Sequence, residues 1–168
     1  MKRIMATTAL AALIFTGCGT GPDNTEAPYN PVDESWKAVE NFIFAWNTRD
    51  QDLLSETLSD DFEMPLSEED WADYNGDGII DKSLPENIYL NVASVIFSSY
   101  SHVELLVDYS AGQSNEFTGD WNMKVYNIEG GEQTGWSASG ETVIVCAENG
   151  SGQWNVISVT EIPAPPEE

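Results

Sequence analysis

Apolar residues recur at helical spacing in the first half of the chain. One set lies three or four positions apart and would form a single buried helix face. It comprises Trp36, Val39, Phe42, Ile43 and Trp46. Asp33 precedes this set, and its carboxylate is well placed to cap the helix. A second, short helix containing Leu53, Leu54 and Leu58 is expected to end at residues 59–61.

A third helix has a start signal of its own. Ser83 and Glu86 form the S-x-x-E pattern of a capping box, and Pro85 stands in the first turn, where its missing N–H costs nothing. Four apolar residues would then line one face of the helix. They are Ile88, Val92, Val95 and Ile96.

After Ser98 the period changes from helical to alternating. One side of the expected strand carries Val103, Leu105, Val107 and Tyr109, and the other carries His102, Glu104 and Asp108. Further strands are expected at residues 116–127, 134–148 and 153–162. Glycine-rich breaks at residues 130–131 and 149–152 favour antiparallel hairpins. Helices followed by a meandering sheet predict an α+β fold, with the N-terminal helices packed in a curled antiparallel sheet.

Three stretches resemble the nuclear transport factor 2-like superfamily, which includes the SnoaL-like proteins. They are residues 42–50, residues 58–62 and residues 149–157. The resemblance implies a cone-shaped domain over residues 32–163, with residues 67–83 as an acidic insertion. It implies no single function, because the superfamily holds isomerases, dehydratases, hydrolases and binding proteins without catalytic activity.

The N-terminus is typical of an exported and anchored protein. A basic start and an apolar stretch too short to span a bilayer predict a cleaved signal peptide over residues 1–17. Residues 15–18, Phe-Thr-Gly-Cys, resemble the bacterial lipobox, which makes Cys18 the lipidated first residue of the mature protein. The alternative is an ordinary secretory signal cut just before an unmodified Cys18. By resemblance to sorted lipoproteins, Gly19 favours the outer membrane, if the organism has one.

Two stretches have compositions that disfavour a packed structure. Residues 18–31 are rich in Gly, Pro, Asn and acid, so we expect a flexible tether between membrane and domain. Residues 164–168 are expected to be a frayed tail. The predicted location is the cell envelope, with the membrane as partner through the lipid on Cys18.

The net charge excludes several classes of partner. The chain carries 29 acidic and 6 basic residues, a net charge of −23. Such a surface repels nucleic acid and anionic lipid head groups and favours cationic partners, metal ions included. Solubility alone is the alternative explanation of the acidity. Lipidation of Cys18 would leave Cys146 unpaired, in an apolar run expected to be a buried strand.

Residues 73–81 match the spacing of an EF-hand or dockerin-type calcium loop. Ligand positions 1, 3, 5 and 9 hold Asp73, Asn75, Asp77 and Asp81, and the carbonyl of Ile79 can add a ligand. Position 12 holds Leu84 in place of the bidentate glutamate, so we expect weak calcium binding, with a dissociation constant of about 10⁻⁴ to 10⁻³ M. The alternative is that Asn75-Gly76 and Asp77-Gly78 are turn dipeptides of an acidic loop.

The sequence offers no catalytic motif. His102 is the single histidine and shares its strand face with Glu104 and Asp108, so it could act as a general base. A surface histidine beside acids is the commoner situation. No Ser-His-Asp order, phosphate loop or dinucleotide fingerprint is present. No catalytic residue is therefore predicted.

The six tryptophans suggest a ligand pocket. Trp121, Trp136 and Trp154 lie on neighbouring expected strands and could line the cone around a small apolar or sugar-like ligand. The alternative is that they fill the core.

The favoured function is a membrane-tethered envelope lipoprotein whose calcium-stabilised domain binds a ligand or an envelope protein without catalysis. The alternative is a small SnoaL-like hydrolase or isomerase. An acidic or histidine side chain deep in an open cone would favour the enzyme, whereas a cone plugged by Trp and Phe would favour the interaction domain. The sequence predicts no oligomeric state.

Overall fold

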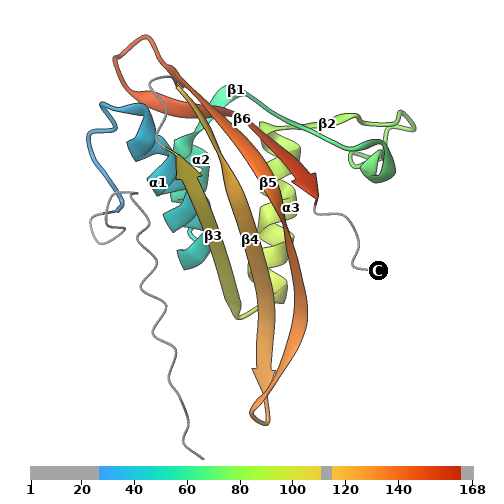
Figure 1. Ribbon diagram of the computed structural model, residues 1–168. Helices are drawn as coiled ribbons and strands as arrows, with labels where there is room; N and C mark the ends of the chain where they lie inside the picture. The colour runs from blue at the N-terminus through green and yellow to red at the C-terminus, as the bar shows by residue number, and fades with distance from the viewer. Residues whose placement is uncertain (1–26, 111–114, 164–168) are drawn as a thin grey trace, which may run out of the picture.

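In the part of the chain that the structure describes, residues 27–110 and 115–163, three α-helices lie on one side of a six-stranded sheet (Figure 1). The structure is a computed structural model. The helices are α1 (Ser35–Thr48), α2 (Gln51–Thr57), α3 (Glu86–Ser99) and the short 3-10 helix η1 (Glu68–Asp70). The strands are β1 (Leu58–Pro65), β2 (Ser83–Pro85), β3 (His102–Ser110), β4 (Glu116–Glu129), β5 (Glu132–Glu148) and β6 (Trp154–Pro163).

The sheet has one parallel pair of strands. Its order is β2-β1-β6-β5-β4-β3, and all neighbours are antiparallel except β1 and β6. The expected α+β class is confirmed, and the parallel pair is the difference from the antiparallel sheet that we expected. It arises because the chain passes from α2 directly into β1, which lies along β6.

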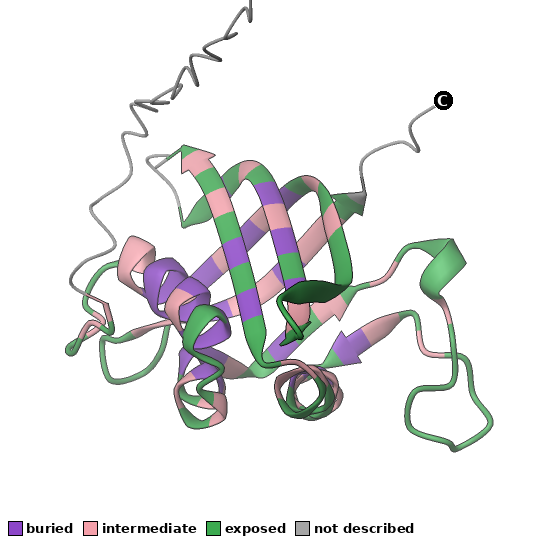
Figure 2. Ribbon diagram, turned by 90° about the horizontal axis from the view of Figure 1, so that it is seen from below, coloured by how far each residue is buried: buried purple, intermediate pink, exposed green. Residues whose placement is uncertain are grey.

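Long strands β4 and β5 bend over the helices, as Figure 2 shows. Two glycines allow neighbouring strands to approach closely along this bend. A Cβ atom on Gly119 would lie 2.2 Å from the carbonyl oxygen of Asp108, and one on Gly135 would lie 1.9 Å from that of Val125. Because no side chain fits at such distances, glycine at both places is required for the curvature of the sheet.

Helix α1 supplies the centre of the core. The predicted face is confirmed at four of its five residues, since Val39, Phe42, Ile43 and Trp46 are each at most 4% exposed, and the fifth, Trp36, is half-buried. At the end of the helix, the side chain of Asn47 bonds to the free edge of β3. It donates to the carbonyl oxygen of Leu105 at 2.9 Å and accepts the N–H of the same residue at 2.6 Å. These bonds satisfy backbone groups on the side of β3 where the described part of the chain places no further strand.

The predicted start of α1 is wrong. The helix begins at Ser35 with Glu34 in the N-cap position, and no side chain caps it. Asp33 instead forms an ion pair with Lys37, one helical turn further on. Because the Asp33 carboxylate forms this ion pair, it does not cap the helix as the local pattern predicts.

The capping box predicted for α3 is also wrong. Ser83 belongs to β2, and its hydroxyl donates to Glu63 of β1, so the helix begins only at Glu86. Strand pairing between β1 and β2 competes with the cap and prevails. On the helix itself, Val95 is 63% exposed, unlike the rest of the predicted apolar face.

The strands predicted over residues 102–109, 116–127, 134–148 and 153–162 are confirmed in place, and the facing predicted for the first of them, β3, is confirmed as well. On β3, Val103 and Leu105 are buried and His102 is exposed. The β4–β5 turn falls at Gly130 and Gly131, as predicted. Strands β1 and β2 are not predicted by the pattern, because Leu58 at the start of β1 also fits the second helix and Ser83 of β2 also fits a helix cap.

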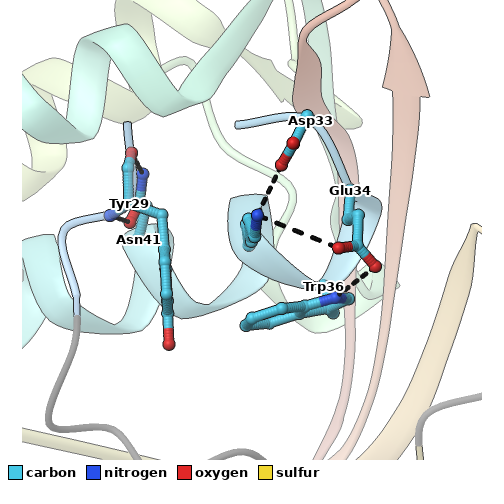
Figure 3. A network of polar contacts seen from close by, with 6 residues as sticks. Tyr29, Asp33, Glu34, Trp36 and Asn41 are labelled. Atoms are coloured by element: carbon cyan, nitrogen blue, oxygen red, sulfur yellow. Dashed lines mark hydrogen bonds and ion pairs between the residues drawn. The ribbon is translucent and has the colours of Figure 1, made fainter. Parts of the chain in front are cut away.

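An extended arm precedes α1 and is bound to it (Figure 3). Asn41 of α1 is 3% exposed, and its side chain bonds to both backbone polar groups of Tyr29, at 2.6 Å and 3.0 Å. The ammonium of Lys37 lies 5.9 Å and 5.5 Å from the ring centroids of Tyr29 and Trp36. Packing against the domain therefore begins by Tyr29, inside the stretch 18–31 that the sequence predicts to be a tether.

Three sequence predictions concern residues outside the described part of the chain. They are the signal peptide over residues 1–17, the lipidated Cys18 and the tail over residues 164–168. Of the helices that are described, none has the length and apolar character needed to cross a bilayer.

Candidate functional site

A cavity of about 240 Å³ lies between the inner face of the sheet and the helices α1 and α3. Five aromatic side chains line it, together with aliphatic residues and methionines. The aromatic residues are Phe42, Trp46, Tyr89, Trp121 and Trp136. An apolar cavity of roughly 150 Å³ holds benzene, so this one has room for a somewhat larger compact molecule.

Glu161 of β6 is the carboxylate that lines the cavity. It pairs with Thr142 of β5, which also lines the wall. Burial raises the pKa of the Glu161 carboxyl to about 7, and the negative charge of Asp70 contributes to the rise. A carboxyl of this kind both holds and releases a proton near neutral pH.

A β-bulge turns Glu161 toward the cavity. Val156 pairs with Cys146, and Ser158 pairs with the adjacent Val145, so Ile157 is an extra residue in β6. The extra residue reverses the alternation of the strand, which brings Glu161 inside and leaves Ile162 50% exposed.

Tyr89 adds a hydroxyl to the cavity wall. Its oxygen accepts a hydrogen bond from Trp46 Nε1 at 3.1 Å. Burial first, and then the charge of Glu161, raise the pKa of the Tyr89 hydroxyl far above its ordinary value, so the hydroxyl keeps its proton. Nearby on the wall, the buried Nε1 of Trp121 has no hydrogen-bond partner among the described residues.

The three tryptophans predicted to line a pocket fall at two places. Trp121 and Trp136 line the cavity, with Trp121 8% and Trp136 43% exposed. Trp154 lines a separate hollow of about 230 Å³ beside the N-terminal arm. The structure therefore brings together Trp121 and Trp136 and leaves Trp154 apart.

The residues of the predicted calcium loop lie on an exposed loop that extends to one side of the sheet (Figure 2). The carboxylate of Asp73 accepts the backbone N–H groups of Gly76, Asp77 and Gly78 at 2.7 to 3.1 Å. The other side chains of the pattern also accept backbone N–H groups. Asn75 accepts that of Asp77, Asp77 accepts that of Ile79, and Asp81 accepts that of Tyr74.

These bonds fold the loop without drawing its carboxylates to one point. Over residues 27–110 and 115–163, no three His, Cys, Asp or Glu side chains converge as metal ligands would. Asp73 Oδ1 accepts two of these N–H groups, whereas the carboxylate oxygens that accept a single N–H keep a lone pair for a cation. The donor set, hard oxygens alone, is the one that calcium prefers.

His102 lies away from the cavity. It is exposed on the outer face of β3, where its ring stacks on Tyr126 with centroids 4.8 Å apart. Tyr126 in turn donates to Glu104 at 2.6 Å. The histidine beside acids that the alternation predicts is therefore a surface feature.

A second buried carboxyl is found outside the cavity lining. Glu40 of α1 is 4% exposed and accepts a hydrogen bond from Tyr109 of β3, while its Oε2 has no partner among the described residues. Burial raises the pKa of Glu40, and the bond from Tyr109 opposes the rise. Cys146 is likewise fully buried, and burial raises the pKa of its thiol to about 12.

No protein-family model matches the chain, and no curated protein matches it. Solved structures do. A protein from Kribbella flavida superposes with a TM-score of 0.56 at 12% identity, over 80% of this chain and 90% of that one. A nuclear transport factor 2-like superfamily protein from Salmonella enterica gives 0.54 at 11% identity, over 79% and 89%.

A nuclear transport factor 2-like protein of unknown function from Exiguobacterium gives a TM-score of 0.50 at 9% identity, over 77% of this chain and 99% of that one. Likeness at such low identity concerns the arrangement of helices and strands alone. The chain is thus an α+β domain with the nuclear transport factor 2-like fold.

Proposed function

We propose that the domain binds a small, mainly apolar molecule in the cavity between the sheet and helices α1 and α3. The observation that carries the proposal is an open space of about 240 Å³ whose wall is mostly apolar and contains one carboxyl, that of Glu161. Ligand sites of proteins commonly combine an apolar wall with a few polar groups that orient the ligand. A domain needing only a stable core gains nothing from such a void, because unfilled space weakens packing.

A pair of variants tests this proposal. Ala138 lines the cavity, and its neighbour Ser139 is exposed on the same strand. Ala138→Phe is expected to fill the space and to abolish binding of 1-adamantanol, measured by calorimetry, whereas Ser139→Phe is expected to leave binding unchanged. Equal binding by both variants would place the ligand elsewhere and contradict the proposal.

Proton transfer is the second candidate function, because an acidic side chain inside an open cone is the feature that favours an enzyme. A group with a pKa near the working pH is the best general acid or base. In an isomerase, the Glu161 carboxylate would take a proton from a carbon beside a carbonyl and return it at a more distant carbon. Cyclohex-3-en-1-one is a suitable probe, since its conversion to the conjugated enone is followed by absorbance. No conversion above that of a Glu161→Gln variant would remove this candidate.

We further propose that the domain is tethered to a membrane of the cell envelope through a lipid on Cys18, and that calcium stabilises the loop of residues 73–81. The tether is supported by the lipobox-like residues 15–18. The calcium site is supported by the spacing of Asp73, Asn75, Asp77 and Asp81, and by the oxygen donors that this spacing supplies.

A further inference from the structure

The ionisable groups of the cavity wall can carry only negative charge. Among its lining residues the ionisable groups are the Glu161 carboxyl and the Tyr89 hydroxyl, and no Lys, Arg or His is present. No hydrogen bond or ion pair to the Glu161 carboxyl is found in the part of the chain that the structure describes, nor do its oxygens count among the buried unpaired atoms there. The carboxyl therefore borders the open space without a protein partner.

Like the carboxyl, the aromatic side chains of the wall favour a cationic ligand. Five rings line the space, three of them tryptophans, and the face of an aromatic ring attracts a cation. Indole gives the strongest attraction. Aromatic rings beside a carboxylate are the usual chemistry by which proteins recognise amines and quaternary ammonium groups.

The net charge of the whole molecule also favours a cationic ligand. With a net charge of −23, it attracts cations from solution and repels anions. We propose, on the basis of the binding function above, that the ligand is an organic cation. Its ammonium lies against the Glu161 carboxylate, and its apolar body lies among the aromatic and aliphatic residues of the cavity.

A neutral ligand is the competing possibility, because a protonated Glu161 could donate a hydrogen bond to a hydroxyl or carbonyl oxygen. The two differ in their dependence on pH. The carboxyl has a pKa of about 7, and the charged or ionisable groups that act on it are Asp70 of η1 and, across the cavity, Tyr89 of α3. Tyr89 stays protonated, so Glu161 is the group lining the cavity that changes charge between pH 5.5 and 8.

Three probes with one apolar body separate these possibilities. The full chain is titrated by calorimetry with 1-aminoadamantane, 1-adamantanol and 1-adamantanecarboxylate. At pH 8 we expect the amine to bind at least about tenfold more tightly than the alcohol, and the carboxylate not to bind. At pH 5.5 the amine is expected to lose about tenfold or more in affinity, since few Glu161 carboxyls are then ionised, while the alcohol is unaffected.

Matched variants assign the preference to Glu161. Glu161→Gln is expected to reduce the preference for the amine to less than about twofold and to keep the binding of the alcohol, which shows that the cavity is intact. Glu141→Gln, which removes the same charge from the exposed face of the neighbouring strand, is expected to preserve the preference. Equal affinities of amine and alcohol at pH 8, or a preference that survives in Glu161→Gln, would overturn the inference alone. Failure of all three probes to bind would contradict the cavity-binding function as well.

Discussion

Glu161 is held inside the cavity at a cost to stability. Its carboxyl loses hydration, meets the charge of Asp70 and gains no protein partner in the described part of the chain, so the folded protein favours the protonated form. In the unfolded chain the same carboxyl has its ordinary pKa of 4.5. A residue kept in such a position is more easily explained by a ligand than by folding.

Stability should therefore fall as the pH rises. A carboxyl whose pKa is raised in the folded state stabilises it fully below pH 4.5, and this contribution is lost as the pH passes through about 7. Glu161→Gln cannot ionise, so its free energy of unfolding should equal that of the wild type near pH 4 and exceed it at pH 8, by at most about 3 kcal/mol. Urea unfolding at several pH values measures the difference. Glu40 also makes stability depend on pH, but it does so equally in the wild type and in Glu161→Gln, so its contribution cancels in the difference between them.

At this scale the site was only partly predictable from sequence. Trp121 and Trp136 follow the alternation of their strands, and both were expected on the cavity wall. Glu161 was not expected there. Strict alternation along β6 places Glu161 on the outer face, and the extra residue Ile157 reverses this placement. A bulge depends on how two strands pair, so the alternation within one strand does not predict it.

Among the elements, the pair β4 and β5 depends most on individual residues. Gly135→Ala would place a Cβ atom against the backbone of Val125, so the strands must separate there. We expect a loss of at least about 2 kcal/mol in the free energy of unfolding, measured by urea denaturation. Gly150→Ala is the control, since nothing lies within 4 Å of its added Cβ, and it should change stability by less than about 0.5 kcal/mol. A mild effect of Gly135→Ala would show that the sheet can curve without close approach there.

The loop of residues 73–81 gives a prediction of its own. With a dissociation constant of about 10⁻⁴ to 10⁻³ M, calcium at 10 mM should stabilise the fold by about 1 to 3 kcal/mol. Thermal unfolding should then occur several degrees higher with calcium than with chelator, and magnesium should not substitute.

Two variants localise the effect of calcium. Asp77→Ala, which removes the side-chain oxygens at loop position 5, should abolish the shift, and Asp60→Ala, which removes an exposed carboxylate from β1, should retain it. An unchanged midpoint in the wild type would remove the proposed site.

Element boundaries were least predictable where two segments compete for one polar group. Ser83 and Glu86 fit a helix cap, yet Ser83 bonds to Glu63, twenty residues earlier. Likewise Leu58 fits the second helix and instead begins β1 beside Val156. Long periodic segments such as α1 and β3 were predicted well, because their whole pattern favours one structure and no distant partner offers a better one.

At the scale of the whole molecule, the arm before α1 relates the domain to its proposed anchor. Asn41 fixes Tyr29 through both of its backbone polar groups, so the chain enters the domain beside α1. The strong negative charge would keep the domain surface from adhering to anionic lipids. Membrane attachment should therefore depend on the lipid alone.

Cysteine substitution tests that dependence. Cys18→Ser removes the proposed acylation site, and the protein should move from the membrane pellet to the soluble fraction of lysed cells, followed by immunoblotting. Cys146→Ala is the matched control, because that thiol is fully buried in β5, so this variant should stay with the membrane. A Cys18→Ser protein that still sediments with membranes and resists washing with high salt would require another anchor, since the acidic domain has no charge attraction to lipid that could replace the acyl chains.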